Sequence, residues 1–359
     1  MLASIPVYVY YFAAIALSAI VSAYSIKKII FITKNHKIYD VPDDIRKIHG
    51  AEIPSLGGIG IFIGYVIVAA FFWPHAHFFM PYILASSAIL FFTGIYDDIM
   101  NMRPSKKLIA QLIASLVTVV FAHIRFGSLY GLFGIDILPW WPDVILTTLC
   151  CTFFINVFNF VDGIDGLAGL LAALYMLILG TLFACTGHQA VAGISFALAG
   201  AIVGLLFFNL APAKIYMGDT GSMFLGFSIF IFSLLFLNWF GEQGQFELTW
   251  IHGPQKVLLL IFAMLFLPIF DAIRVFVLRA SRGISPLKAD RTHLHYYLLD
   301  AGFTHTQAVL VIVGTNIAIM ALAYIMQDVN PYLMLLSITL VASLVLFIVY
   351  RLRQRKLSK

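Results

Sequence analysis

Long apolar segments alternate with short polar ones along almost the whole chain of 359 residues. Each apolar segment has about 17–25 residues, the length of helix that crosses a ~30 Å hydrocarbon core. Alternating strand-like segments are absent from the sequence, so the pattern predicts helices and not the strands of a barrel. We therefore expect an all-α integral membrane protein with about eleven membrane-spanning helices. The predicted spans are 6–27, 54–73, 80–96, 107–124, 142–158, 167–185, 190–209, 222–240, 256–279, 308–326 and 331–350.

The positions of the cations predict how these spans are oriented. Nearly every Lys and Arg lies on one side of the predicted membrane, in the loops 28–53, 97–106, 159–166, 210–221 and 280–307 and in the tail 351–359. Arg125 and Lys256 fall clearly on the other side. By the positive-inside rule the cation-rich side is cytoplasmic, which places the N-terminus outside and the C-terminus inside. We predict one polytopic membrane domain over 1–359, ending in a basic cytoplasmic tail at 351–359 that rests against the anionic leaflet.

Composition narrows the class of protein further. Hydrophobic residues make up 62% of the chain and charged residues 11%, which excludes an ordinary soluble domain. The net charge of +5 follows the predicted membrane topology, so it does not indicate a nucleic-acid partner. The first lysine, Lys27, comes after the first apolar segment, so we interpret that segment as a retained span and not a cleaved signal peptide. Cys150, Cys151 and Cys185 lack metal-ligand spacing, and we expect buried thiols.

Five carboxylates at the ends of apolar segments are the strongest candidates for function: Asp97, Asp98, Asp162, Asp165 and Asp219. All five lie on the predicted cytoplasmic side. Acids at the ends of membrane spans are costly and are by default functional. Clustered carboxylates favour a hard divalent metal, and a metal with carboxylates indicates phosphate chemistry. The competing interpretations are solvated helix ends, polar contacts between helices, or the ion path of a carrier.

Asp97 and Asp98 are neighbours at the end of the third predicted span. Adjacent residues on a helix point about 100° apart, so the two cannot serve one ion equally. We expect one of them to ligate or orient while the other handles a proton. An acid at a helix C-terminus is also unfavourable to the helix dipole, which argues against a purely structural role.

Asn156, Asn159, Asp162 and Asp165 recur every three residues and form one polar stripe on an apolar segment. The glycines of the DGIDG segment are expected to break the helix beside the carboxylates and to let the backbone approach a ligand. Polar contacts between membrane helices normally use one or two amides, whereas this stripe ends in two acids.

Asp219 lies in the glycine-rich segment MGDTGS, shortly after Asn209. A glycine-rich turn that opens a helix suits anions, and a carboxylate within it suits a metal bound to phosphate. The Walker pattern GxxxxGK[ST] is absent from the sequence, so this is not a P-loop. The alternative is an ordinary turn with a helix N-cap.

The loop after the ninth predicted span carries Arg291, His293 and His295. Zinc would need a third ligand, and none is obvious nearby, so a cationic set that holds a diphosphate is the better interpretation. The alternative is a basic loop beside the membrane. Asp271 and Arg274, three residues apart on the ninth span, are expected to form a structural pair.

Five segments in order resemble the bacterial polyprenyl-phosphate N-acetylhexosamine-1-phosphate transferases, the WecA/TagO-like branch of glycosyltransferase family 4 that is related to MraY. They are IHGAEIPSLGG, DDIMNMRPSKKLIAQ, NVFNFVDGIDGLAG, FNLAPAKIYMGDTGSMFLG and ADRTHLHYYLLDAG. The resemblance implies transfer of a sugar 1-phosphate from a UDP-sugar to undecaprenyl phosphate, with release of UMP. It implies Mg²⁺, with Mn²⁺ as an alternative, and the bacterial cytoplasmic (inner) membrane. A homodimer is compatible with the resemblance.

The resemblance also implies roles for individual residues. Asp219 matches the metal ligand, with Asp98 as a second ligand. Asp97 and Asp98 match the essential acidic pair, one of which would deprotonate the lipid phosphate, and His293 is the third catalytic candidate. The residues assigned to substrate binding are Lys47, Lys107, Asn156, Asn159, Asp162, Asp165, Asn209, Arg291 and His295.

One position departs from the pattern of that branch, which has a further histidine where this chain has Tyr296. A role for a third histidine therefore does not carry over, and His293 is favoured. UDP-GlcNAc is the favoured donor, because we identify no motif for a peptide-bearing sugar. UDP-GalNAc and UDP-QuiNAc stay open, together with the polymer pathway and the choice between direct attack and an aspartyl intermediate. Acids on one face argue against a carrier, and the intact acid set argues against an inactive scaffold.

Overall fold

The computed structural model describes residues 6–36, 53–72, 78–243, 251, 253–283 and 291–358, with side chains left undescribed at 241–243. Within these residues the chain is helical, and its β-structure is one isolated bridge between Ser128 and Ile137. The helices are α1 (Val7–His36), α2 (Gly57–Ala69), α3 (Met80–Met100), α4 (Pro104–Phe121), the 3-10 helix η3 (Leu132–Gly134), α5 (Trp140–Val161), α6 (Leu167–Cys185), α7 (Gln189–Asn209), α8 (Gly218–Gln243), α9 (Pro254–Ser281), α10 (Leu294–Asp300), α11 (His305–Ile325) and α12 (Pro331–Leu357).

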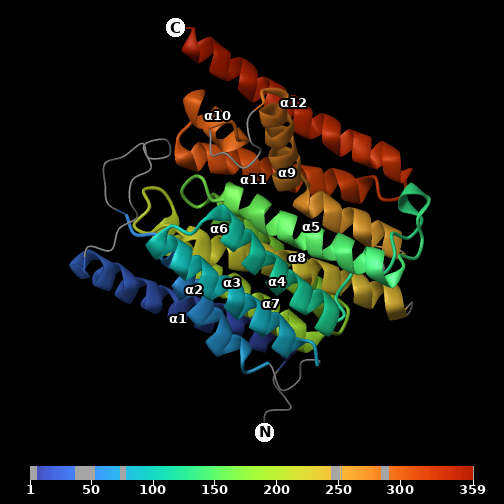
Figure 1. The fold of residues 1–359 in the computed structure, drawn as a ribbon, viewed down its shortest axis with the longest axis horizontal. Coiled ribbons are helices and arrows are strands. Elements are labelled where there is room, and N and C mark those ends of the chain that lie inside the picture. The colour runs from blue at the N-terminus through green and yellow to red at the C-terminus, as the bar shows by residue number, and fades with distance from the viewer. Residues whose placement is uncertain are drawn as a thin grey trace.

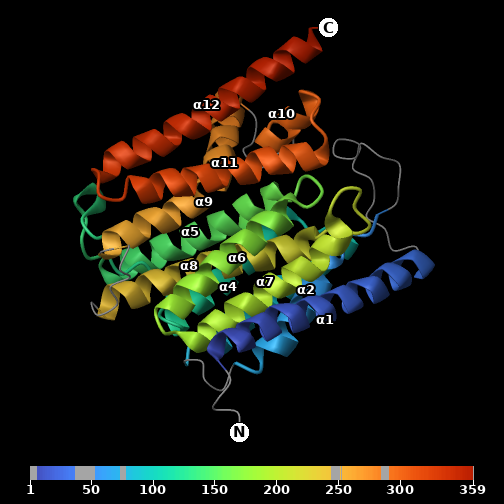
Figure 2. The same cartoon turned by 180° about the vertical axis from the view of Figure 1, so that it is seen from behind.

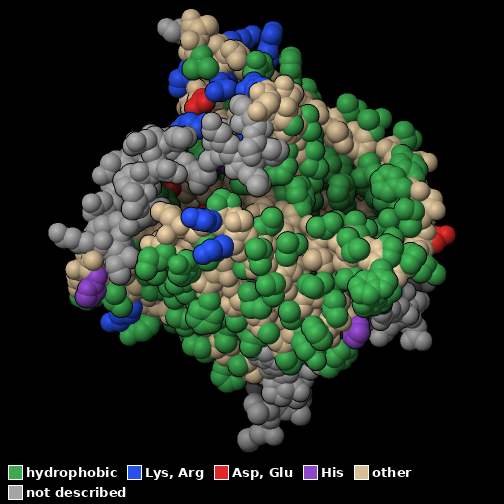
Figure 3. Space-filling view, in the orientation of Figure 1, with side chains coloured by type: hydrophobic (Ala, Val, Ile, Leu, Met, Phe, Trp, Pro, Cys, Tyr) green, Lys and Arg blue, Asp and Glu red, His purple; other side chains and the backbone are tan. Residues whose placement is uncertain are grey.

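Ten of the described helices are long and apolar enough to cross a membrane, which confirms an all-α membrane protein. The second predicted span, 54–73, corresponds to the shorter helix α2, which has 13 residues. Figures 1 and 2 show one bundle with α1 at one edge and α12 at the opposite edge. The surface in Figure 3 is largely hydrophobic, and Lys and Arg side chains gather where α10 and the end of α12 lie.

Helices α7 and α8 form the centre of the bundle and are buried along most of their length. Phe224, Phe227, Ile231 and Phe232 of α8 are fully buried. A helix that is apolar on all sides belongs in the interior and not at a surface. The first turn of α8 is therefore held by packing on every side, and this turn carries Asp219.

Glycines let two neighbouring helices approach the first turn of α8 closely. A Cβ atom on Gly94 of α3 would lie 2.4 Å from the Cα of Thr220, and one on Gly58 of α2 would lie 2.2 Å from the nitrogen of Gly221. The nitrogen of Gly58 also donates to the carbonyl of Met217, at 2.8 Å. Small residues at such crossings allow backbone contact between membrane helices. The start of α8 is thus fixed against α2 and α3.

Helix α9 contains Pro268 and changes direction within the bundle (Figure 1). Proline has no N–H, so the carbonyl of Met264, four residues earlier, loses its helical partner. The side chain of Asn316 in α11 donates to that carbonyl, at 3.2 Å. An unsatisfied carbonyl is costly inside a bilayer, so this bond stabilises the bend and joins α9 to α11.

Replacing Gly94 by alanine is expected to lower stability by about 1–3 kcal/mol, because a new methyl group must displace the backbone of α8. The measurement is the thermal unfolding midpoint of the purified protein in detergent. Gly314→Ala is the matched control, since a Cβ at this helical glycine of α11 would meet no described atom within 4 Å. Equal midpoints for the two variants would contradict the close packing of α3 on α8.

Candidate active site

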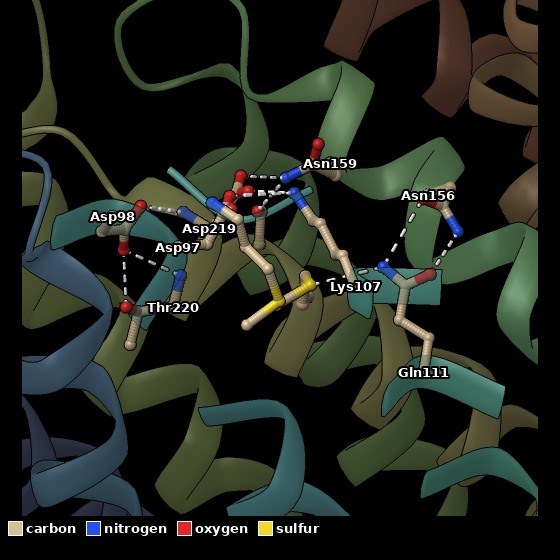
Figure 4. A network of polar contacts seen from close by, with 11 residues as sticks. Asp97, Asp98, Lys107, Gln111, Asn156, Asn159, Asp219 and Thr220 are labelled. Atoms are coloured by element: carbon tan, nitrogen blue, oxygen red, sulfur yellow. Dashed lines mark hydrogen bonds and ion pairs between the residues drawn. The ribbon is translucent and has the colours of Figure 1, made fainter. Parts of the chain in front are cut away.

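The start of α8 is surrounded by carboxylates (Figure 4). Its first three backbone N–H groups are bound by acids from other parts of the chain. The N–H of Gly218 donates to Asp162, in the turn after α5. The N–H of Asp219 donates to Asp98 of α3 at 2.8 Å, and the N–H of Thr220 does so at 3.0 Å. Carboxylates are favoured at a helix N-terminus by its free N–H groups and its dipole.

Asp219 itself points to the opposite side, where Lys107 and Asn159 meet it. The side chain of Lys107 in α4 forms an ion pair with Asp219 and lies 3.4 Å from Asp97. The side-chain nitrogen of Asn159 donates to Asp219 at 2.5 Å and to Ser222 at 2.8 Å. Helices α3, α4, α5 and α8 therefore each place a polar side chain at one point near the end of the bundle.

The neighbouring acids Asp97 and Asp98 have different partners, as their spacing predicts. Asp98 is bound to the start of α8 and also accepts the hydroxyl of Thr220, at 2.5 Å. One oxygen of Asp97 accepts the N–H of Met102, at 2.7 Å. The other faces Lys107, and the carboxyl groups of Asp97 and Asp219 are within hydrogen-bonding reach. The second oxygen of Asp97 therefore faces the same space as Asp219.

The polar stripe lies partly in α5, with Asn156 and Asn159, and partly in the turn after it, with Asp162 and Asp165. The helix ends at Val161, so the predicted break beside the two acids is confirmed. Asn156 donates to the side chain of Gln111 at 2.6 Å and to the carbonyl of Thr152 at 2.8 Å. Sequence analysis did not select Gln111, although it lies one helical turn after Lys107 on the same face of α4, and that spacing was the available signal.

Asp165 and Asn209 hold two loops together. Asp165 accepts the N–H of Ala213 at 3.1 Å and lies 3.4 Å from the ring of His305. Asn209 is buried, accepts the N–H of Gly166 at 3.2 Å and donates to the carbonyl of Ile215 at 2.9 Å. These contacts fix the turn after α5 relative to the segment that leads into α8. Both residues thus act on the main chain around the acids.

Asp162 is half-buried in that turn, directly after α5. Burial and the nearby charge of Asp219 raise the pKa of Asp162 to about 7. Its carboxyl group is therefore close to half-protonated near neutral pH, unlike an ordinary aspartate.

The histidine segment forms a second polar cluster beside the first. His293 contacts Asp271 through Nδ1, at 2.9 Å, and Asp271 also pairs with Arg274 at 2.7 Å. The predicted pair of Asp271 and Arg274 is confirmed, and the contact with His293 is an addition that sequence analysis missed. The rings of His293 and His295 are parallel, with centroids 5.6 Å apart. Burial, followed by the neighbouring His293, lowers the pKa of His295 to about 3, so this imidazole is neutral near pH 7.

The two clusters touch at Gly163. A Cβ atom on Gly163 would lie 2.2 Å from Nε2 of His295, so the turn after α5 packs directly against the histidine segment. Between α5, α6, α9 and α11 lies a small, partly open cavity of about 30 Å³. Its lining is mainly apolar and includes Phe160, Leu171 and Pro268, with His293 among the few polar residues.

Arg291 is held at the outer side of the histidine segment. It pairs with Asp300 at 3.0 Å, and Arg353 of α12 binds the other oxygen of the same carboxylate, also at 3.0 Å. The guanidinium of Arg291 lies over the ring of Tyr296, 5.0 Å from its centroid. Tyr296 therefore packs against Arg291, in the position where the related branch has a histidine. Lys47, a predicted substrate-binding residue, lies outside the described residues.

The donor set fits a hard divalent cation better than zinc. In the described part of the chain no three His, Cys, Asp or Glu side chains converge as a ligand set. Asp97 and Asp219 are two adjacent carboxylates, and Lys107 is the cation paired with both. Mg²⁺ is commonly held by one or two carboxylates, with substrate phosphates and waters completing its octahedron. The residues present are compatible with that mode.

Comparison with known proteins places this site within a matched segment. The model of glycosyl transferase family 4 matches residues 80–237, which include Asp97, Lys107, Asp162 and Asp219. The chain is 31% identical to the undecaprenyl-phosphate alpha-N-acetylglucosaminyl 1-phosphate transferase of Escherichia coli strain K12, over 78% of this chain and 74% of the relative.

Two further relatives come from other bacteria. The decaprenyl-phosphate N-acetylglucosaminephosphotransferase of Mycolicibacterium smegmatis is 31% identical, over 86% of this chain and 81% of the relative. The probable undecaprenyl-phosphate N-acetylglucosaminyl 1-phosphate transferase of Bacillus subtilis strain 168 is also 31% identical, over 74% and 71%.

Asp98→Ala is expected to destabilise the protein by about 1–2 kcal/mol, because the N–H groups of Asp219 and Thr220 lose their acceptor. The thermal midpoint in detergent provides the measurement. Asp136→Ala, at an exposed aspartate in the loop before α5, is the control and should leave the midpoint unchanged. A midpoint for Asp98→Ala equal to that of the control would contradict the capping role.

The raised pKa of Asp162 predicts a pH-dependent stability. An unfolded aspartate loses its proton near pH 4, whereas the folded one keeps it until about pH 7. The contribution of Asp162 is therefore fully present below about pH 4 and is lost as pH rises through about 7. Between pH 5 and 8, in the presence of a chelator, the midpoint of the wild type should fall more than that of Asp162→Asn. Parallel curves would show that Asp162 does not titrate in this window.

Proposed function

The chain belongs to glycosyl transferase family 4, and on this premise we propose that it transfers N-acetylglucosamine 1-phosphate from UDP-GlcNAc to undecaprenyl phosphate. The products are undecaprenyl diphosphate N-acetylglucosamine and UMP, the starting material of a cell-envelope polysaccharide. The observation that carries this proposal is the meeting of Asp97, Lys107 and Asp219 at the start of α8, within the matched segment. The names of the relatives support a polyprenyl phosphate as acceptor and N-acetylglucosamine 1-phosphate as the transferred group.

The reaction replaces one phosphoanhydride bond by another. An oxygen of the lipid phosphate attacks the phosphorus that carries the sugar, and UMP leaves with the electrons of the broken P–O bond. Such a transfer depends on positioning and charge neutralisation more than on covalent help. Lys107 offers a cation held between the carboxylates of Asp97 and Asp219, where it can neutralise charge on a phosphate.

We propose Mg²⁺ as the cofactor, with Asp219 and Asp97 as its protein ligands. Asp98, which the sequence suggests as the second ligand, already accepts three hydrogen bonds from Asp219 and Thr220. When bound, Mg²⁺ would neutralise charge on the diphosphate of the donor. Asn159 would keep Asp219 in place through its 2.5 Å hydrogen bond.

The histidine segment is the proposed binding region for the phosphates at the membrane side of the site. Arg291 supplies nitrogen donors there, and Nε2 of His293, whose Nδ1 is bound to Asp271, is an acceptor. Gly163 brings the segment against the turn that carries Asp162. The mainly apolar, partly open cavity beside His293 marks the side from which the lipid chain would approach. Asn156, Asp165 and Asn209 support these loops through the contacts described above.

We propose that the acid-bearing end of the bundle faces the cytoplasm of a bacterium, in the inner membrane. The end of α1 carries Lys34 and His36, and the last turn of α12 carries Arg355 and Lys356, as the positive-inside rule requires for cytoplasmic ends. The N-terminus then lies outside and 351–359 form a cytoplasmic tail of the single membrane domain 1–359. Assembly as a homodimer is part of the same proposal.

The test is UMP release by the purified protein in detergent, with undecaprenyl phosphate, Mg²⁺ and separately UDP-GlcNAc, UDP-GalNAc or UDP-QuiNAc. We expect release with UDP-GlcNAc, abolished by a chelator and reduced at least about 10²-fold in Asp219→Ala, because an electrostatic partner of the transition state is lost. Asp136→Ala serves as the unaffected control. Absence of UMP with every donor, from folded protein, would overturn the proposal, and release with another sugar would correct the donor.

A further inference from the structure

Asp271 lies in α9, three residues after the proline that bends this helix. Its carboxylate accepts hydrogen bonds from three different groups: the guanidinium of Arg274, at 2.7 and 3.2 Å, Nδ1 of His293, at 2.9 Å, and the N–H of Leu294, at 3.1 Å. Arg274 also donates to the carbonyl of Thr292, at 2.5 Å. The pair of Asp271 and Arg274 thus binds three consecutive residues of the histidine segment. An ion pair within one helix would not need these contacts with another segment.

These contacts determine which nitrogen of His293 is free. A carboxylate accepts hydrogen bonds, so Nδ1 of His293 must carry a proton to donate to Asp271. The other nitrogen, Nε2, is buried and has no hydrogen-bond partner among the described residues. Buried polar atoms are normally paired, so an unpaired Nε2 indicates a ligand that binds there.

The ring of His293 is also fixed in its plane. Phe160 of α5 stacks on one side, with centroids 5.5 Å apart, and the parallel ring of His295 lies 5.6 Å away. The ring borders the apolar cavity. The bend at Pro268 is itself anchored, because Asn316 binds the carbonyl of Met264. The backbone that carries Asp271 is therefore held on both sides of the bend.

We propose that Asp271 is a positioning residue that holds the proton of His293 on Nδ1 and presents the lone pair of Nε2 to a protonated oxygen of a substrate phosphate. A carboxylate that orients an imidazole in this way sets both its tautomer and its direction. Asp271 does not touch the substrates and acts through His293. The kinetic consequence rests on the proposed transfer, whereas the protonation of Nδ1 does not.

Asp271→Asn is the informative substitution. One oxygen of Asp271 is bound by Arg274 and by the N–H of Leu294, so the oxygen of the new amide stays there. Its NH₂ group then faces His293 and donates to Nδ1, which forces the neutral proton onto Nε2. The substitution keeps the shape of the side chain and reverses the tautomer.

The first readout is the ¹⁵N NMR spectrum of histidine-labelled protein in detergent at pH 7.5, with the His293 signals assigned by their loss in His293→Gln. We expect a protonated Nδ1 in the wild type and an unprotonated Nδ1 in Asp271→Asn. An unprotonated Nδ1 in the wild type would overturn the proposal, and this measurement needs neither a variant at Asp271 nor an active enzyme.

The second readout is UMP release. Asp271→Asn should lower kcat by at least about tenfold, because Nε2 then carries the proton and no longer accepts one from the phosphate, and the KM for the UDP-sugar should change less than about threefold. Asp143→Asn is the matched control, a buried aspartate at the opposite end of α5 that pairs with Arg125 at 2.9 Å and accepts the N–H of Gly127. It should lower the melting temperature without changing the His293 signals or kcat.

The outcomes separate the two proposals. Unchanged His293 signals and unchanged kcat in folded Asp271→Asn would overturn the positioning role while leaving the transferase proposal intact. Wild-type protein that releases no UMP but shows a protonated Nδ1 would overturn the transferase proposal alone.

Discussion

The hydrogen bonding at the N-terminus of α8 is the constraint on which the rest of the site depends. A helix begins with backbone N–H groups that have no partner within the helix, and a bilayer offers no water to bind them. Here carboxylates of Asp162 and Asp98 bind the first three of these groups. Each acid is in turn attached to another helix, so satisfying one helix end brings α3, α5 and α8 together. Asp219, the next acid, is left to face Lys107.

Burial makes this arrangement rigid. Helix α8 is buried almost throughout, and glycines in α2 and α3 contact its first turn without intervening side chains. The loops around it are held by Asp165 and Asn209, which bind main-chain groups. Farther out, Asp300 joins Arg291 to Arg353, so that the last helix supports the histidine segment. The first turn of α8 is thus surrounded by the loops that Asp165 and Asn209 hold, and the histidine segment lies outside these loops.

Local patterns allowed much of the fold and part of the site to be predicted. Apolar length identified the long helices, and the glycines of the DGIDG segment identified the end of α5 at Val161. The short length of α2 was not predicted, because its flanking apolar residues could have extended the helix. The contact between Asp271 and His293 joins residues 22 positions apart across a loop, and no periodicity encodes such a distance. The roles of the site residues remain predictions for the assays described above.

The bond between Asn316 and the carbonyl of Met264 has a consequence for the lipid environment. A bent membrane helix usually offers a bare carbonyl at its bend, to which water or a lipid headgroup can be drawn. In this protein the carbonyl oxygen of Met264 accepts a hydrogen bond from Asn316 of α11, and Met264 is buried. The bend therefore presents no unpaired carbonyl of Met264 to the acyl chains. About one turn after the bend, the same helix carries the carboxylate of Asp271. The bend therefore separates a part of α9 that resembles lipid from a part that serves the polar site.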